Sequence, residues 1–122
     1  MKVLVVEDEP ASLKLAGLVL STAGHEVAEA DAVHIAVEEI MRSEPDVILL
    51  DLALPGIDGL TLARSLKADP KRRHIVIIAI TAFPESFSRE AVLAAGCDAY
   101  IEKPINTRKL TEQVASAVER LK

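Results

Sequence analysis

Five side chains that could bind and transfer a phosphoryl group follow short apolar runs in this 122-residue chain. If these runs are parallel strands of one sheet, the five side chains meet at one edge. Ligands in open α/β sheets bind outside the carboxyl ends of the strands, so we expect the functional site there. The side chains are Glu7 and Asp8 after residues 3–6, Asp51 after residues 47–50, Thr81 after residues 75–80, and Lys103, which comes with Glu102 after residues 99–101.

The three acids are suited to bind magnesium. Carboxylates that crowd together repel and raise one another's pKa unless a cation neutralises them. Mg²⁺ is hard and octahedral, and proteins hold it with one or two carboxylates, a carbonyl, waters and a phosphate oxygen. We predict Asp8 and Asp51 as direct ligands, the backbone carbonyl of Ala53 as a third, and Glu7 as a ligand through water.

Asp51 is the best candidate for a nucleophile. It stands between an apolar run and a loop that contains Pro55-Gly56, so its carboxylate should be accessible and could attack phosphorus to form an aspartyl phosphate. Lys103 supplies a second cation, and the Thr81 hydroxyl could donate to a phosphoryl oxygen. Alone, Lys103 could be a surface ion pair and Thr81 an ordinary strand residue, so the prediction rests on their occurring together.

The elements that must position these residues alternate between strands and helices. Proline or glycine marks several boundaries: Pro10 suits a first helical turn, and Gly24 and Gly96 suit helix ends. Either Asn106 or Thr107 could cap the last helix. The predicted strands are residues 3–6, 26–30, 47–50, 75–80 and 99–101, and the predicted helices are residues 10–23, 33–43, 60–67, 87–95 and 106–121.

The apolar runs indicate an α/β fold. Continuous runs such as residues 47–50 and 75–80 suit strands that are covered on both faces. Right-handed crossovers then place helices on both faces of a doubly wound parallel sheet. The length and the 50% hydrophobic content suit one domain, residues 1–122.

Composition excludes several classes of function. The net charge of −5 leaves no basic field for a nucleic acid, so we expect no direct binding to one. The lone Cys97 fits a reducing cytoplasm and is expected to be a small buried residue. No apolar run approaches the roughly 20 residues that span a bilayer, so we expect no membrane insertion.

Four segments, in this order and spacing, resemble a bacterial response-regulator receiver domain over the whole chain. They are Glu-Asp-Glu-Pro at 7–10, Asp-Leu-Ala-Leu-Pro-Gly-Ile-Asp-Gly at 51–59, Thr-Ala at 81–82 and Lys-Pro at 103–104. Residues 81–83, 96–97 and 99–105 are also similar to single-domain receivers of cell-cycle phosphorelays. Whether the chain stands alone or belongs to a longer regulator stays open.

The resemblance implies a flavodoxin-like, five-stranded parallel sheet of order 2-1-3-4-5 with five helices. It implies Mg²⁺-dependent phosphotransfer from a phosphohistidine, on a histidine kinase or histidine phosphotransferase, to Asp51. It also implies a cis bond before Pro104. Such a domain is a phosphoacceptor rather than an enzyme and catalyses at most its own phosphorylation and dephosphorylation.

The resemblance also implies a switch made by Thr81 and Tyr100. The hydroxyl turns toward the phosphoryl group, the aromatic ring swings inward, and the face formed by residues 87–95, Tyr100 and residues 106–121 changes for a downstream protein target. A half-buried Tyr100 without a switching role is the alternative.

Family comparisons link the positions of Ala53 and Phe83 to phosphoryl lifetime; neither can orient a water, so we expect slow self-dephosphorylation.

The first helix carries a second apolar stripe. With Leu13 and Leu20 facing inward, Ala11, Leu15 and Leu18 tilt toward another side. This stripe could dock on the helical bundle of a kinase or phosphotransferase, although scattered surface leucines are normal.

Three other classes of protein are alternatives to a receiver. A flavin-binding protein needs a Ser/Thr/Gly-rich phosphate loop where this chain has acids. An aspartyl-phosphate phosphatase needs an acid two residues after its nucleophile, where this chain has Ala53. The stronger rival is a pseudo-receiver, an interaction module that is never phosphorylated, and the intact acids, Thr81 and Lys103 argue against it.

Overall fold

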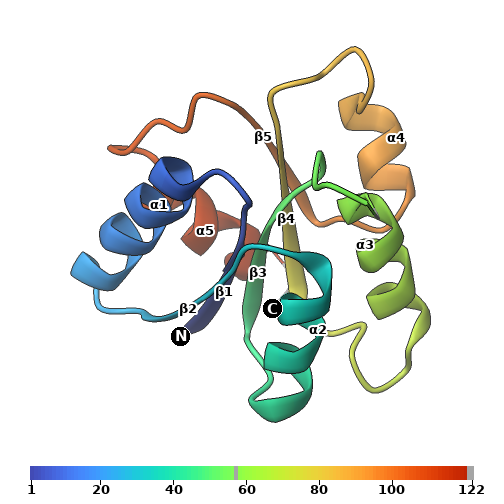
Figure 1. Cartoon of the computed structure of the whole chain (residues 1–122), viewed down its shortest axis with the longest axis horizontal. Helices are drawn as coiled ribbons and strands as arrows, with labels where there is room; N and C mark the ends of the chain where they lie inside the picture. The colour runs from blue at the N-terminus through green and yellow to red at the C-terminus, as the bar shows by residue number, and fades with distance from the viewer. Residues whose placement is uncertain (57, 121–122) are drawn as a thin grey trace.

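The computed structural model describes residues 1–56 and 58–120. Strands and helices alternate along these residues, as the sequence predicts (Figure 1). The strands are β1 (Lys2–Val6), β2 (Glu26–Ala30), β3 (Val47–Asp51), β4 (Val76–Thr81) and β5 (Ala99–Glu102). The helices are α1 (Pro10–Thr22), α2 (Val33–Arg42), α3 (Gly59–Ala68), α4 (Arg89–Ala94) and α5 (Leu110–Glu119).

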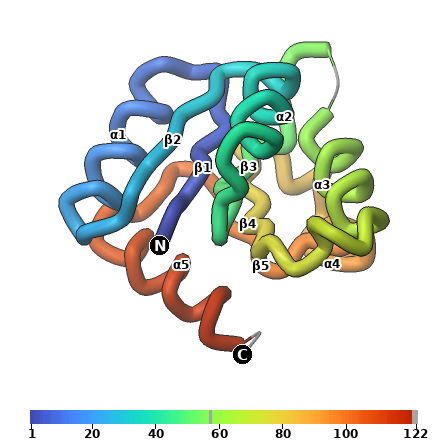
Figure 2. The backbone as a smooth tube through the Cα atoms, turned by 90° about the horizontal axis from the view of Figure 1, so that it is seen from below, coloured from blue at the N-terminus to red at the C-terminus, as the bar shows by residue number. Residues whose placement is uncertain are grey.

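The five strands form one parallel sheet in the order β2-β1-β3-β4-β5. Helices cover both of its faces: α1 and α5 lie on one side, and α2, α3 and α4 lie on the other (Figures 1 and 2). This is the flavodoxin-like arrangement and strand order that the resemblance implies. The point where strand order reverses lies beside β1, so the carboxyl ends of β1 and β3 flank the crevice where ligands of such sheets bind.

Alternate side chains of each inner strand enter two separate cores. Val3 and Val5 pack with α1 and α5, whereas Leu4 and Val6 pack with α2, α3 and α4. Every residue of β3 and β4 is buried. Burial of an aliphatic side chain stabilises the fold by roughly 1.5–3 kcal/mol, which explains why these strands read as continuous apolar runs.

The last two helices begin later than the sequence predicts. Ser88 caps α4 by accepting a hydrogen bond from the Ala91 N–H at 3.2 Å, so Phe87 precedes the helix. Asn106 and Thr107 do not cap α5; the Asn106 side chain accepts from the Arg108 N–H at 3.0 Å within a turn, and the helix starts at Leu110. The predicted end of this helix, residue 121, lies outside the described residues.

Several local predictions are confirmed. Gly96 follows the Ala95 C-cap with φ +110, a conformation that favours glycine, and the Lys103–Pro104 bond is cis. Cys97 is buried.

Within residues 1–56 and 58–120, no helix combines the length and apolar character needed to cross a bilayer.

Candidate functional site at the carboxyl edge of the sheet

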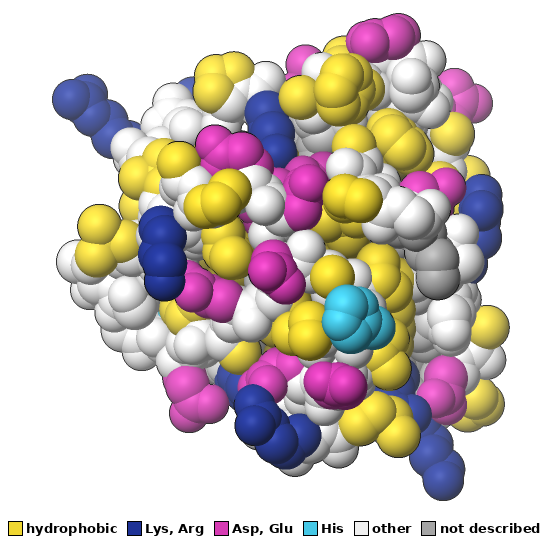
Figure 3. Space-filling view, in the orientation of Figure 1, with side chains coloured by type: hydrophobic (Ala, Val, Ile, Leu, Met, Phe, Trp, Pro, Cys, Tyr) yellow, Lys and Arg dark blue, Asp and Glu magenta, His cyan; other side chains and the backbone are white. Residues whose placement is uncertain are grey.

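The sheet register brings the predicted site residues to one edge. Asp51 ends β3 opposite Ile80, and Thr81 ends β4 opposite Glu102, one residue before Lys103. Glu7 continues β1, and its N–H donates to the Ala30 carbonyl at 3.0 Å. In the space-filling view, acidic side chains flank a basic one in the upper part of the molecule (Figure 3). Residues far apart in the chain therefore form one site.

Three carboxylates form a cluster at this edge. Glu7, Asp8 and Asp51 each offer an oxygen, and the three oxygens lie within 4.8 Å of one another. Glu7 and Asp51 are each only 5% exposed, whereas Asp8 faces the solvent. The cluster thus has a buried floor and an open side through which a cation or a phosphoryl group can enter.

Lys103 bridges the two buried acids. Its ammonium forms ion pairs with Glu7 and with Asp51 Oδ2, the latter at 3.0 Å. The Ala53 N–H donates to the other Asp51 oxygen, Oδ1, at 2.9 Å. These two contacts hold the Asp51 carboxylate in a fixed orientation at the strand end.

The two buried acids share protons unequally. Burial, together with a hydrogen bond to Asp51, raises the pKa of Glu7 to about 7. Burial also acts to raise the pKa of Asp51, but hydrogen bonds from Glu7, from the Ala53 N–H and from Lys103 outweigh it and hold that pKa below its ordinary value. Asp51 is therefore the carboxylate of the pair that stays ionised near neutral pH.

The donor set fits a hard divalent cation. One ammonium cannot neutralise three neighbouring carboxylates, so a further cation is favoured at this cluster. Oxygen donors from two carboxylates and an open side for water and phosphate match the coordination that Mg²⁺ prefers.

Thr81 and Tyr100 form hydrogen bonds to residues outside the acid cluster. Thr81 is fully buried, and its hydroxyl accepts a hydrogen bond from the Phe83 N–H at 2.9 Å. The half-buried Tyr100 donates its hydroxyl to the Phe87 carbonyl at 2.6 Å. Both side chains thus contact the loop between β4 and α4, which links the site edge to the face formed by α4, β5 and α5.

The predicted stripe on α1 faces the solvent. Ala11 is exposed, Leu15 is 42% exposed and Leu18 is 64% exposed, whereas Ala16 and Leu20 enter the core. Leu15 also lines a hollow of about 130 Å³ together with Lys103 and Pro104. The stripe is therefore continuous with the rim of the acid site.

Two local contacts were not predicted. Glu9 caps α1, because its carboxylate accepts from the Ser12 N–H at 2.8 Å. The Arg89 guanidinium lies 6.0 Å from the centre of the Tyr100 ring. The first contact could have been suspected from Glu9 standing before Pro10, whereas the second joins residues on different elements and has no sequence signal. Asp58 caps α3 by accepting from the Thr61 N–H at 2.9 Å.

A doubly wound sheet with buried acids and a lysine at its carboxyl edge is suited to bind a divalent cation and a phosphoryl group. The family model "Response regulator receiver domain" matches residues 3–115. The polar-differentiation response regulator DivK of Brucella ovis is 35% identical over 114 residues, which cover 93% of each chain. The chain thus belongs to the response regulator receiver domain family.

Solved structures agree with this assignment. A proposed response regulator of Chloroflexus aurantiacus has a TM-score of 0.90 and 31% identity, with 98% of each chain covered. A CheY-like receiver domain protein of Methanospirillum hungatei has a TM-score of 0.89 and 28% identity, with 98% of this chain and 94% of that chain covered. This protein is a receiver domain of two-component signal transduction, similar to DivK, and its family acts as phosphoacceptors.

Proposed function

We propose that Asp51 is the phosphoacceptor and that this chain serves as a receiver in a cytoplasmic phosphorelay, as its similarity to DivK suggests. The observation that carries the proposal is the ionised, immobilised Asp51 carboxylate beside Lys103 at the sheet edge. An Asp51 oxygen attacks the phosphorus of a phosphohistidine, the phosphorus–nitrogen bond breaks, and the imidazole leaves.

Each neighbour of Asp51 has a role in this transfer. Lys103 already contacts Asp51 and offsets charge that builds on the phosphoryl oxygens. The Ala53 N–H fixes one carboxylate oxygen, so the other is presented for attack. Glu7 holds Lys103 in place on the side away from the solvent.

Asp8, Asp51 and the Ala53 carbonyl would hold Mg²⁺, with Glu7 bound through water. The clustering of Glu7, Asp8 and Asp51 oxygens supports this assignment. When bound, the ion supplies Lewis-acid neutralisation of the transferring phosphoryl group. The residues themselves bind and orient the phosphoryl group. In this proposal they serve the phosphorylation of Asp51 and not a reaction on another substrate.

Thr81 and Tyr100 form the proposed switch. To reach a phosphoryl oxygen on Asp51, the Thr81 hydroxyl must change its partner from the Phe83 N–H. That change would move the loop between β4 and α4, where Tyr100 now donates to the Phe87 carbonyl. Two arrangements of this loop, with a phosphoryl group favouring one, would transmit the signal to a downstream protein.

The stripe of Ala11, Leu15 and Leu18 is the proposed docking surface for a histidine kinase or histidine phosphotransferase. Its exposure and its continuity with the Lys103–Pro104 rim support this assignment. A helix docked there would bring its histidine toward Asp51.

The experiment that tests the function is phosphorylation by acetyl phosphate, followed by intact mass. We expect one phosphoryl group to be added in Mg²⁺, none in EDTA, and none on Asp51→Asn. Glu38→Gln, which changes an exposed acid on α2, is the matched control and should take up phosphate normally. Failure of the wild-type chain to accept phosphate from either acetyl phosphate or a phosphorylated phosphotransferase would favour the pseudo-receiver.

A further inference from the structure

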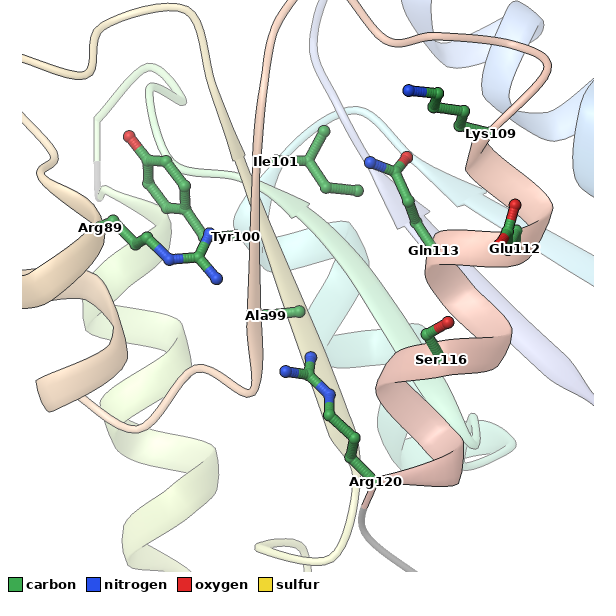
Figure 4. A pocket seen from close by; sticks show the side chains of 9 residues that line it. All are labelled: Arg89, Ala99, Tyr100, Ile101, Lys109, Glu112, Gln113, Ser116 and Arg120. Carbon is green, nitrogen blue, oxygen red and sulfur yellow. The ribbon is translucent and has the colours of Figure 1, made fainter.

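A hollow of about 170 Å³ opens between α2 and α3, which lie side by side on one face of the sheet (Figures 1 and 2). It is separate from the groove of about 350 Å³ along β5 (Figure 4), which lies on the face that the proposed function gives to the downstream protein. The hydrogen bonds and ion pairs of Asp51 and Lys103 go to residues that do not line the hollow. The α2–α3 hollow therefore has no part in the proposed phosphotransfer.

Apolar side chains form most of the walls of the α2–α3 hollow. Ile40 of α2 and Leu62 and Leu66 of α3 are buried, whereas Val37 and Met41 of α2 are exposed and stand at its mouth. An apolar cavity of about 150 Å³ is large enough to hold benzene. The hollow therefore has room for an apolar group the size of one ring and for a small substituent.

Arg72, in the loop between α3 and β4, brings a hydrogen-bond donor without a partner to this hollow. Its Nη1 donates to Asp69 Oδ2 at 2.9 Å, and its Nη2 donates to Met41 Sδ at 3.1 Å. Its Nε is buried and finds no acceptor within residues 1–56 and 58–120. A buried N–H without an acceptor is unfavourable, because it has lost its hydrogen bond to water. Since Arg72 lines the hollow, an acceptor held there could reach Nε after a rotation of the Arg72 side chain.

The charge of Arg72 is already compensated by Asp69, which also lines the hollow. The Lys71 N–H and the Arg72 guanidinium hold the pKa of Asp69 below its ordinary value, so this carboxylate is ionised at neutral pH. A carboxylate bound in the hollow would be repelled by Asp69 and by the net charge of −5 of the chain. A neutral hydrogen-bond acceptor would meet no such repulsion.

We propose that the α2–α3 hollow binds a small neutral molecule that carries a carbonyl oxygen, such as an amide, an ester or a lactone. The apolar part of the molecule would cover Ile40, Leu62 and Leu66, and its carbonyl oxygen would accept a hydrogen bond from the Arg72 Nε–H. This site does not depend on the phosphoacceptor role of Asp51.

A protein surface matches the hollow less well. Val37 and Met41 are the exposed large apolar residues that line it. Two such side chains offer far less area than the roughly 800 Å² per partner that a stable interface buries. Apolar walls around a small volume, with one polar group that lacks a partner, are instead typical of a small-molecule site.

Titration of the ¹⁵N-labelled full chain with benzamide, followed by ¹H–¹⁵N NMR, tests the proposal. Benzamide joins one ring to a neutral carbonyl group, benzoate carries an anionic group of similar shape, and toluene has no acceptor. We expect benzamide to shift the Arg72 Nε–H signal and signals of α2 and α3, with a Kd on the order of millimolar for so few atoms. Benzoate should bind about tenfold more weakly or worse because of Asp69, and toluene about three- to tenfold more weakly because it accepts no hydrogen bond.

Two variants separate the hydrogen bond from the hollow itself. Arg72→Lys keeps a positive charge beside Asp69 but removes Nε, so it should weaken benzamide about three- to tenfold and leave toluene unchanged. Val37→Trp places a larger side chain at the mouth of the hollow and should prevent the binding of both compounds. Arg64→Lys, which changes an exposed arginine on α3, is the matched control and should alter neither Kd.

Several results would overturn the proposal. These are the absence of benzamide-induced shifts in α2 and α3, equal binding of benzamide and either comparison compound, or normal benzamide binding by Arg72→Lys. Self-association of the chain that Val37→Trp abolishes, without benzamide binding, would assign this face to a second copy and would overturn it as well. Because benzamide binding is measured on the unphosphorylated chain, its outcome is distinct from that of phosphoryl uptake at Asp51.

Discussion

Glu7 and Asp51 are neighbouring buried acids whose pKa values shift in opposite directions. Both are buried beside Lys103, yet Glu7 titrates near neutrality while Asp51 stays ionised. The difference comes from the number of donors that each carboxylate accepts, since Asp51 is fixed by Ala53 and Lys103 and also by Glu7. A single proton can therefore reside on Glu7 while Asp51 stays ionised.

The raised pKa of Glu7 predicts a pH-dependent stability in EDTA. Between the ordinary value of 4.5 and about 7, the folded chain binds more protons at Glu7 than the unfolded chain does. This contribution to stability is fully present below pH 4.5 and is lost as pH rises through 7. Glu7→Gln should therefore raise the free energy of unfolding at pH 8 by about 1–3 kcal/mol relative to wild type, and by little at pH 5.

Urea unfolding in EDTA at pH 5 and pH 8 measures this difference. Glu38→Gln, on an exposed acid, is the control and should show no pH-dependent gain. An equal effect of Glu7→Gln at both pH values would contradict the assignment.

Ala53 and Phe83 predict a long-lived phosphoryl group. Phe83 is 49% exposed near the site, and neither side chain can hydrogen-bond a water for attack. We expect the phosphorylated chain to decay over many minutes. Ala53→Asn, which keeps the N–H that binds Asp51, should accelerate decay roughly tenfold by orienting a water. Intact mass against time, after removal of acetyl phosphate, measures both rates, and a wild-type lifetime of seconds would contradict the prediction.

At the scale of elements, α3 begins directly against the end of β3. The Gly59 N–H donates to the Leu52 carbonyl at 3.0 Å, and a Cβ added to Gly59 would lie 2.5 Å from the Asp51 carbonyl oxygen. Glycine is required here because the helix start and the acceptor strand touch through their backbones.

Gly59→Ala should therefore disturb both stability and phosphorylation. Either α3 or the end of β3 must move, which should lower the free energy of unfolding by about 1–3 kcal/mol and slow phosphorylation by acetyl phosphate. Ser65→Ala, on the exposed side of the same helix, is the matched control. Normal stability and normal uptake in Gly59→Ala would show that the close approach has no consequence for the site.

The exposed stripe of α1 makes a prediction about phosphotransfer. Because Leu18 is 64% exposed, Leu18→Glu should fold normally, slow phosphotransfer from a phosphorylated histidine phosphotransferase by about tenfold or more, and leave acetyl phosphate uptake unchanged. Met41→Glu, which changes a 67% exposed residue on α2, should affect neither reaction. Equal loss of both reactions in Leu18→Glu would refute a docking role.

At the scale of the whole molecule, the site links four strands. Glu7 follows β1, Asp51 ends β3, Thr81 ends β4 and Lys103 follows β5, so a ligand that binds them all connects most of the sheet. Binding at such a site favours the folded state as a whole rather than one local segment.

Mg²⁺ should therefore raise the thermal stability of the unphosphorylated chain. At a concentration tenfold above Kd, the gain in free energy of unfolding is about 1.4 kcal/mol, and EDTA should reverse it. Asp8→Asn should remove most of this gain, whereas Asp31→Asn, on an exposed acid after β2, should keep it. Scanning calorimetry with and without Mg²⁺ measures the effect, and an identical Tm in both conditions would argue against a metal site.

Much of this organisation could be predicted from the sequence. Runs such as residues 47–50 had to be doubly covered strands because four consecutive apolar side chains point to both faces of a sheet. Once the strands were parallel, the side chains directly after such runs had to meet at one edge; these are the acids, a hydroxyl and a lysine. Gly96 marked a helix end because glycine readily adopts a positive φ. These inferences depend only on neighbouring residues and on the geometry common to all parallel sheets.

Other features were decided only by the tertiary structure. The late start of α5 follows from a turn at Asn106, and nothing local distinguishes that turn from a helix cap. The unequal pKa values of Glu7 and Asp51 depend on burial and on Lys103, which is 96 residues from Glu7 in the chain. The groove along β5 exists because Arg89, Lys109 and Arg120, on two separate helices, are brought to one edge strand, and spacing along the sequence carries no record of such contacts.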